Sequence, residues 1–275
     1  MTARVRELLQ YRELVENLVI RDLKVRYKNS ILGFLWSLVN PLLLMLVFTV
    51  VFTVMLPNVV IPRFPVFVLC ALLPWNFFNT SLVGAVHSIT QSGHLIKKVY
   101  FPREILPISV VFSNLANFLL ALPVLLILVL VLGGQWTPLL VWVPVVLAVQ
   151  VCFTVGVAFI LATLNVFYRD TSVILEVIMQ AWFFLTPVFY PVDLLPEWKA
   201  VLGLMLPVRR LVYIFNPMAS IIATFRSIIY GFTNGSPPAP PAWDFFTRTA
   251  VTSVLVLVVG YWFLTRYSHR FGEEV

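Results

Sequence analysis

The side chains that could carry acid–base or metal chemistry lie apart from one another in this sequence. Its 12 Asp and Glu residues are scattered singly, apart from Glu273 and Glu274 in the tail. A divalent cation that holds a diphosphate needs clustered oxygen ligands. His87, His94 and His269 lack the spacing of metal ligands. The sequence therefore predicts neither a catalytic site nor a metal site.

The residues that an ATPase needs to bind nucleotide phosphates are missing as well. A phosphate-binding loop ends in Gly-Lys-Ser or Gly-Lys-Thr, and no Gly-Lys pair occurs in the sequence. An ion-coupled pump would need ionisable groups deep in its apolar segments. Glu176, with Gln180 four residues later on the same helical face, is the one candidate. We place Glu176 near a membrane interface, with a proton relay as the alternative, and expect no cofactor in this chain.

The composition excludes a water-soluble globular protein. Hydrophobic residues make up 60% of the 275 residues and charged residues 11%, and the mean hydropathy is +0.95. At about 20 apolar residues for each membrane-spanning helix, this length allows six spans and little else. We assign the net charge of +7 to cytoplasmic loops and membrane lipids, not to nucleic-acid binding.

Six long apolar stretches predict an all-α membrane protein with six transmembrane helices in a single domain, residues 1–275. Backbone groups in a bilayer must be satisfied within the segment, which favours helices, and the alternation of a membrane barrel is missing. Residues 31–190 hold the first five spans and residues 249–265 the sixth. The predicted spans are Ile31–Leu56, Val66–Val86, Ile105–Leu132, Leu139–Leu164, Thr171–Tyr190 and Thr249–Thr265.

Basic residues fall mainly on one side of these spans. Thirteen Lys and Arg residues lie in segment 1–30, the loops 87–104 and 165–171, and the tail, whereas six lie on the other side. The positive-inside rule therefore predicts that both termini are cytoplasmic.

Residues 1–30 have the pattern of an amphipathic helix in the headgroup plane. This interface helix is either a membrane anchor or an element that couples a cytoplasmic partner to the first span. Its predicted apolar face comprises Leu8, Tyr11, Val15, Leu18 and Val25. Its candidate functional residues are the basic ones near its end, Arg21, Lys24, Arg26 and Lys28.

Residues 191–243 are too polar and interrupted for two more full spans. Leu194–Leu206 and Pro217–Tyr230 are apolar but have only about 13 residues each, which suggests re-entrant or interfacial helices. Asn216 before Pro217 is a helix-start signal. We expect a re-entrant helical hairpin on the outer face, between spans five and six.

Four stretches carry a resemblance to a known family. They are RYKNSILGFLWSLVNP (26–41), LPWNFF (73–78), NVFYRD (165–170) and LTPVFYP (185–191). In this order they resemble the permease subunits of polysaccharide-exporting ABC transporters of the type-2 family, which export O-antigen, teichoic acid or capsule. The resemblance covers essentially the whole chain.

The resemblance implies a homodimer in the bacterial inner membrane that works with two copies of a cytoplasmic ABC ATPase subunit. ATP and Mg²⁺ would be bound by that partner, and a lipid-linked polysaccharide would pass along the interface of the permease dimer. In the family, the loops after spans two and four enter clefts of the ATPase. Here those loops are His87–Glu104 and Asn165–Asp170. The alternative is that their charges only orient the chain. The candidate coupling residues are His94, Lys97, Lys98, Arg103, Asn165, Tyr168, Arg169 and Asp170.

Aromatic residues in the first and fifth spans are the candidates for the polysaccharide path, because the C–H faces of sugars stack on aromatic rings. Some of these rings could instead anchor the chain at the membrane interface or pack inside it. The candidate lining residues are Trp36, Phe48, Phe52, Trp182, Phe183, Phe189 and Tyr190.

Two other functions remain open on sequence grounds. An exporter of drugs or small lipids would share the topology but matches the first-span motif less well. A membrane-embedded enzyme acting on polyprenyl-linked glycans would need the carboxylate cluster that the sequence lacks.

Overall fold

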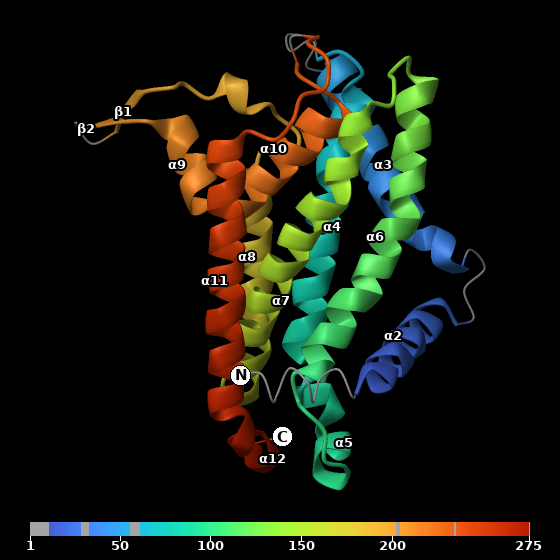
Figure 1. Cartoon of the computed structure of the whole chain (residues 1–275), viewed down its shortest axis with the longest axis vertical. Coiled ribbons are helices and arrows are strands. Elements are labelled where there is room, and N and C mark those ends of the chain that lie inside the picture. Colours follow the sequence, from blue (N-terminus) through green and yellow to red (C-terminus); the bar gives the residue numbers. More distant parts are fainter. Residues whose placement is uncertain (1–10, 29–32, 56–60, 202–203, 234, 275) are drawn as a thin grey trace.

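The structure, a computed structural model, describes residues 11–28, 33–55, 61–201, 204–233 and 235–274. Long helices run along the long axis of the molecule, and an arm projects from one end (Figure 1). The helices are α2 (Arg12–Tyr27), α3 (Trp36–Val50), α4 (Phe64–Ser88), α5 (Gly93–Lys98), α6 (Ile105–Val131), α7 (Val143–Phe167), α8 (Thr171–Leu185), α9 (Val208–Phe215), α10 (Pro217–Ile229), α11 (Trp243–Tyr267) and α12 (Phe271–Glu274). The arm holds the antiparallel strands β1 (Lys199–Val201) and β2 (Leu204–Leu206), with Lys199 opposite Leu206.

Five helical segments of the described chain are long and apolar enough to cross a membrane. A π-helical turn extends α3 to Met55, and a 3₁₀ turn at Pro138–Trp142 precedes α7. The five segments coincide with five of the six predicted ranges apart from their ends. They are Trp36–Met55, Phe64–Ser88, Ile105–Val131, Pro138–Phe167 and Trp243–Glu274.

The range predicted as the fifth span is only partly helical. α8 has 15 residues, so it is about 22 Å long, which is less than the roughly 30 Å of a hydrocarbon core. The prediction that helix continues to Tyr190 is wrong. Thr186 precedes Pro187 and is extended, because the proline ring disfavours helical geometry in the residue before it.

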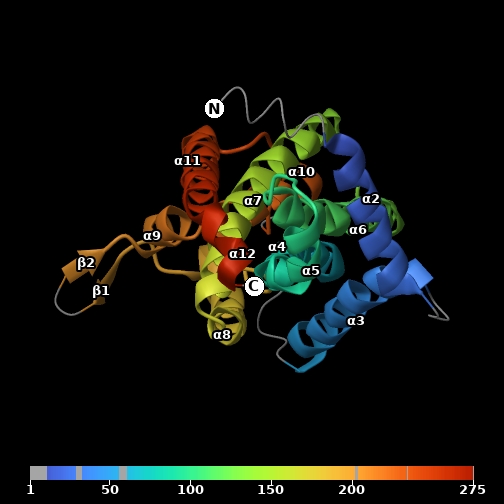
Figure 2. The same cartoon turned by 90° about the horizontal axis from the view of Figure 1, so that it is seen from below.

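α4 is the centre of the helix assembly. Most of its side chains are buried, and it contacts α3, α6, α7, α8 and α10 (Figure 2). Gly84 allows close packing against α6, since a Cβ there would lie 2.8 Å from Cγ1 of Val110. α4 therefore positions most of the long helices directly, while α2 and α11 pack on its neighbours α6 and α7.

The first half of the segment between α8 and α11 does not fold as the sequence predicts. Residues 194–206 were expected to be helical, but a 3₁₀ turn (Val192–Leu194) leads instead into the β1–β2 hairpin. Pro196 and Gly203 within this stretch oppose a helix. The other predicted helix, Pro217–Tyr230, is present as α10, and the side chain of Asn216 accepts a hydrogen bond from the backbone N–H of Ala219. α9, which the sequence did not predict, meets α10 at a 104° bend.

α2 lies against α6 (Figures 1 and 2). Leu18 is buried, and Tyr11 and Val15 pack against the core, as their spacing predicts; Leu14, which was not assigned to this face, packs there as well. Val25 was assigned to the same face but is 67% exposed. The predicted apolar residue Leu8 lies outside the described residues.

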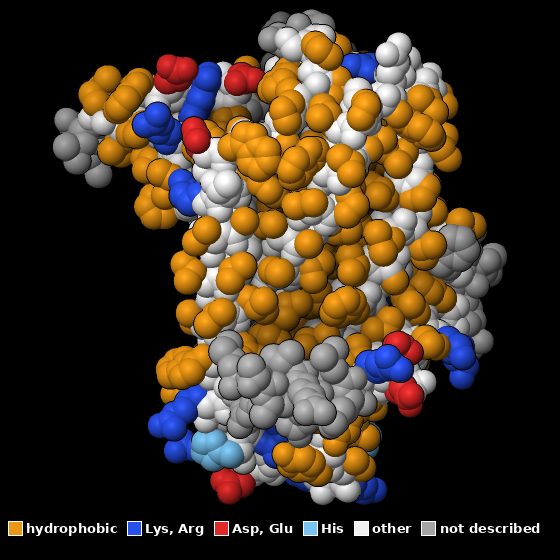
Figure 3. All heavy atoms as spheres, in the orientation of Figure 1, with side chains coloured by type: hydrophobic (Ala, Val, Ile, Leu, Met, Phe, Trp, Pro, Cys, Tyr) orange, Lys and Arg blue, Asp and Glu red, His pale blue; other side chains and the backbone are white. Residues whose placement is uncertain are grey.

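Charged residues gather at the two ends of the molecule. Figure 3 shows Lys, Arg, Asp and Glu at the end that carries α5 and α12 and on the arm at the other end, with a wide hydrophobic band between them. We call these the α5 end and the arm end. A band of this kind is what lipid contact along the helices requires.

The crossing of α7 and α11 gives the first testable prediction. A Cβ on Gly156 would lie 2.6 Å from the backbone nitrogen of Leu257, and a Cβ on Gly260 would overlap the carbonyl oxygen of Gly156. Small residues allow such close helix packing. Gly260→Val should force the helices apart and lower the melting temperature in detergent. Val259→Leu, at an exposed neighbouring position, is the control. Equal melting temperatures for the two variants would contradict this packing.

Candidate functional site

Five of the seven candidate path residues form one aromatic cluster. Phe48 stacks on Phe189 with ring centroids 5.4 Å apart, and Phe52 lies 5.7 Å from the same ring. Phe183 lies 6.3 Å from Phe48, and Tyr190 lies 5.2 Å from Phe189. All five rings are half-buried. The cluster therefore joins α3 and the π-helical turn that follows it to the last turn of α8 and the extended segment after that helix.

The structure places the other two candidate path residues elsewhere. The indole of Trp182 donates a hydrogen bond to Oδ1 of Asn216 (2.9 Å) and packs edge-on against Phe78. Trp36 is 52% exposed and lines a separate cavity beside α2. Trp182 thus also helps to hold the bend between α9 and α10, and Trp36 is not part of the cluster.

Arg226 on α10 fixes the segment that carries the cluster. Its guanidinium is buried and donates hydrogen bonds to the carbonyl oxygens of Pro187 (2.6 Å), Val188 and Phe67 (3.2 Å). It also lies 3.6 Å from the centre of the Phe67 ring, a cation–π contact. Because Pro187 and Val188 follow the end of α8, their carbonyls lack helical partners. Arg226 supplies those partners and so sets the position of Phe189.

Asn216 makes a second connection to the end of α8. Its Nδ2 donates to the hydroxyl oxygen of Thr186 (2.8 Å), while its Oδ1 accepts from Trp182 and from the Ala219 backbone. The bend between α9 and α10 is therefore tied to the point where α8 stops.

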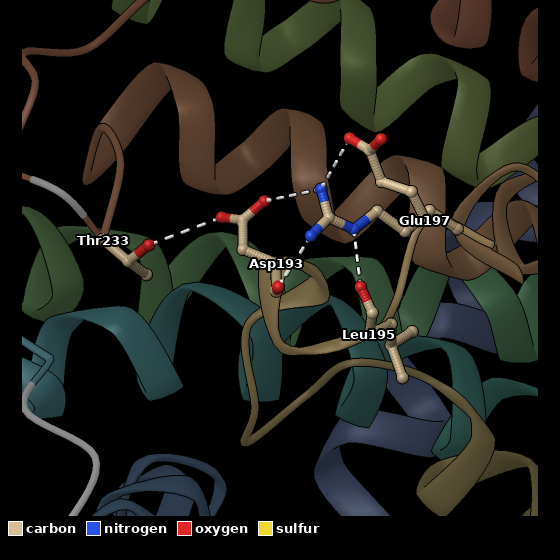
Figure 4. A network of polar contacts seen from close by, with 5 residues as sticks. Asp193, Leu195, Glu197 and Thr233 are labelled. Atoms are coloured by element: carbon tan, nitrogen blue, oxygen red, sulfur yellow. Dashed lines mark hydrogen bonds and ion pairs between the residues drawn. The ribbon is translucent and has the colours of Figure 1, made fainter. Parts of the chain in front are cut away.

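The arm is held to α9 by Arg209. Its guanidinium donates to the carbonyl oxygens of Asp193 and Leu195, both at 2.7 Å, and forms ion pairs with Asp193 (3.8 Å) and Glu197 (3.5 Å) (Figure 4). The carboxylates of both acidic residues are exposed, so these ion pairs contribute little on their own. The two carbonyl contacts fix the path of the chain from α8 to β1.

Most of the candidate coupling residues lie together at the α5 end and are accessible. Five of them have charged or imidazole side chains that are exposed, and Tyr168 is 68% exposed. Tyr100, which the sequence argument passed over, is 84% exposed beside them. The exposed predicted residues are His94, Lys97, Lys98, Tyr168, Arg169 and Asp170.

The other two coupling candidates face inward. Asn165 is 3% exposed, and Arg103 is half-buried with its guanidinium 5.8 Å from the centre of the Phe271 ring. Burial lowers the pKa of Arg103, and the charge of Glu104 acts in the opposite direction. Arginine stays charged even so. These two residues can position the loops but present little surface to a partner.

Phe271 is a site residue that sequence reasoning missed. It is fully buried, and its ring lies 6.1 Å from Phe167 at the end of α7 as well as beside Arg103. It therefore bridges the two predicted coupling loops from the tail. The sequence offers little indication of this packing, since Phe271 is a single apolar residue in a short charged tail.

The basic residues near the end of α2 divide into two groups. Arg21 forms an exposed ion pair with Asp22 (2.9 Å), and Arg21, Lys24 and Lys28 line a hollow on the outside of the helix. Arg26 instead reaches α6 and donates a hydrogen bond to Oδ1 of Asn114 (2.8 Å).

Within the described residues, no group of three His, Cys, Asp or Glu side chains could hold a metal ion.

The apolar helices and the clustered aromatic and basic residues define a multi-pass helical membrane protein. The profile of ABC-2 type transporters matches residues 13–230. The chain belongs to this family.

Sequence similarity to three transport proteins supports this membership. The chain is 40% identical to the O-antigen export system permease protein RfbA of Myxococcus xanthus, over 98% of both chains. It is 34% identical to the protein of the same name from Klebsiella pneumoniae, over 92% of this chain and 91% of that one. The polysialic acid transport protein KpsM of Escherichia coli is 21% identical over 78% of this chain and 80% of its own.

Arg226 gives a direct test of how the site is held. Arg226→Ala should leave the carbonyls of Pro187 and Val188 unpaired, at a cost of about 1–3 kcal/mol for each buried group. We expect a lower melting temperature and more rapid proteolysis between α8 and β1. Arg226→Lys should rescue only part of the loss, because one ammonium group cannot stack and reach three carbonyls.

The matched control is Arg210→Ala, which removes an exposed arginine from the neighbouring helix α9. If Arg226→Ala were as stable as Arg210→Ala, the guanidinium would not hold this segment.

Proposed function

We propose that this chain is the transmembrane subunit of an ATP-driven exporter that moves a lipid-linked polysaccharide across the bacterial inner membrane. The observation that carries the proposal is 40% identity over 98% of the chain to an O-antigen export permease, together with family membership. A separate ATPase subunit would bind ATP and Mg²⁺, since the sequence has no phosphate-binding loop. The chain itself would have no catalytic site.

The proposed topology has six spans in a single domain. They are α3, α4, α6, α7, α8 and α11, with α8 completed by the extended residues after it. The 104° bend favours a re-entrant α9–α10 pair on the outer face over a straight crossing. The excess of basic residues at the α5 end favours a cytoplasmic position for that end and both termini. α2 would then lie in the inner headgroup plane as an interface helix.

A homodimer is the proposed working unit. α8 is apolar, yet it exposes Glu176 and Gln180, and carboxylates are costly against lipid. A second copy on this face would shield them or enclose them in a polar path. Phe183 of the aromatic cluster lies on the same helix. The glycan path would therefore run between the two copies, along α3 and α8.

Cysteine cross-linking can test the dimer. Native Cys70 and Cys152 are first replaced by Ala, and Gln180→Cys is oxidised in intact membranes. Two copies packed on α8 bring equivalent residues near one another, so we expect a covalent dimer on a gel. Val251→Cys on α11, which is 59% exposed, is the matched control and should stay monomeric. Cross-linking at Val251 and not at Gln180 would place the interface elsewhere.

Coupling is proposed to act through the loop between α7 and α8. Tyr168, Arg169 and Asp170 are exposed, and Thr171 already begins α8. A connector this short has few soft dihedrals that could absorb a displacement. Its charged groups can form charge-assisted hydrogen bonds, which are about twice as strong as neutral ones.

The experiment is complementation of an export-deficient strain with an Arg169→Ala, Asp170→Ala double variant. We expect wild-type membrane abundance, because both side chains lie outside the apolar spans, and loss of at least about tenfold in export. ATPase activity of the complex is measured in parallel. Arg266→Ala, a basic residue at the same end, is the control. Normal export by the double variant would contradict the coupling role.

A further inference from the structure

A cavity of about 300 Å³, with one polar and one apolar wall, lies where the end of α2 meets α3, α4 and α6. This is an unusual place for polar groups, since all three long helices are apolar and amide side chains are costly in hydrocarbon. The polar wall includes Arg26, Tyr27 and the four amides Asn40, Asn76, Asn114 and Asn117, with Ser37 and Thr80 beside them, and the rest of the lining is apolar.

Two long-range hydrogen bonds build the cavity. Arg26 donates from Nη1 to Oδ1 of Asn114 (2.8 Å), and the hydroxyl of Tyr27 donates to Oδ1 of Asn117 (2.6 Å). Asn114 is only 2% exposed, and its Nδ2 donates to the backbone oxygen of Val110 (2.9 Å). Consecutive residues of α2 are thus fixed on amides three residues apart on α6, and the guanidinium is held in a set direction.

These contacts leave hydrogen-bond donors for a ligand. A guanidinium has five N–H groups, and Asn114 takes one of those of Arg26. Tyr27 occupies the amide oxygen of Asn117, so the NH₂ group of that side chain stays available. The polar wall therefore offers hydrogen-bond donors to a ligand.

The charge around the cavity favours an anion. No Asp or Glu is among the described residues that line it. The hollow lined by Arg21, Lys24 and Lys28 shares Tyr27 with it, so basic groups continue from the cavity to the surface of α2. Trp36, 52% exposed, offers a ring face at the same site. Phosphate suits the guanidinium, and a sugar suits amides and an indole ring.

We propose that this cavity binds the phosphate and the first sugar of a lipid-linked glycan, an inference that rests on the function proposed above. Arg26 pairs with the phosphate, the amides of Asn76 and Asn117 bond sugar hydroxyls, and Trp36 covers the ring. The lipid tail lies along the apolar surface of α3. The site is separate from the aromatic cluster and serves to load the substrate on the α2 side of α3.

Binding to the assembled transporter in nanodiscs tests the assignment. The probe is a polyprenyl diphosphate that carries one N-acetylglucosamine, and its dissociation constant is measured for each variant. Arg26→Ala should weaken binding about tenfold, since a hydrogen bond to a charged group contributes about 1.5–3 kcal/mol and tenfold is 1.4 kcal/mol. Asn117→Ala should weaken it severalfold. Arg12→Ala, an exposed arginine on the same helix, should bind as the wild type does.

Competitors distinguish the possible sources of the phosphate. Unlabelled sugar-free polyprenyl diphosphate should displace the probe less well than the sugar-bearing form. Phosphatidic acid should displace it only at much higher concentration. Equal displacement by phosphatidic acid would make this a general phospholipid site and overturn the assignment, as would wild-type affinity in Arg26→Ala.

Export measurements separate this inference from the proposed function. If the wild type exports polysaccharide and Arg26→Ala and Asn117→Ala bind and export as well, the loading site is wrong and the exporter stands. If the wild type fails to export polysaccharide with a functional ATPase partner, the proposed function itself is wrong.

Discussion

The buried guanidinium of Arg226 is the contact on which the rest of the site depends. α8 stops one residue before the Thr186–Pro187 step, and the extended backbone that follows cannot satisfy its own carbonyls among apolar helices. Arg226 on α10 donates hydrogen bonds to these carbonyls and at the same time packs on Phe67 of α4. One side chain therefore joins the central helix, the bent pair and the segment that carries Phe189. Without this guanidinium, the segment that brings Phe189 to the aromatic cluster would lose its hydrogen bonds to α10.

α8 connects the two proposed functional regions. Its first turn follows the exposed loop that ends in Asp170, and its last turn carries Phe183 of the aromatic cluster. In the proposed coupling, this helix of 15 residues would carry a displacement from the loop to the cluster. The tail contributes to the same end, because Phe271 packs against Phe167 of one loop and Arg103 of the other. This arrangement suits a permease driven by a separate ATPase.

Sequence reasoning found the features that depend on neighbours in the chain. The apolar segments, the cap at Asn216 and the packing of Leu18 all follow from local spacing. It failed where prolines redirect the backbone, as at the end of α8 and in the β1–β2 hairpin. It also could not see contacts such as Arg226 to Phe67, which are 159 residues apart. Nor does the aromatic type of Trp182 reveal that its indole donates a hydrogen bond to Asn216.

The most direct measurement of the central claim is transport by the purified chain in sealed vesicles, together with its ATPase partner and a lipid-linked polysaccharide. Accessibility of the glycan to a membrane-impermeant glycosidase reports which leaflet holds it. The account predicts that the glycan moves to the far side only when ATP is hydrolysed, and that neither the chain alone nor a complex with an inactive ATPase moves it. Movement by the chain without its partner, or ATP hydrolysis with no movement of any glycan, would contradict the account.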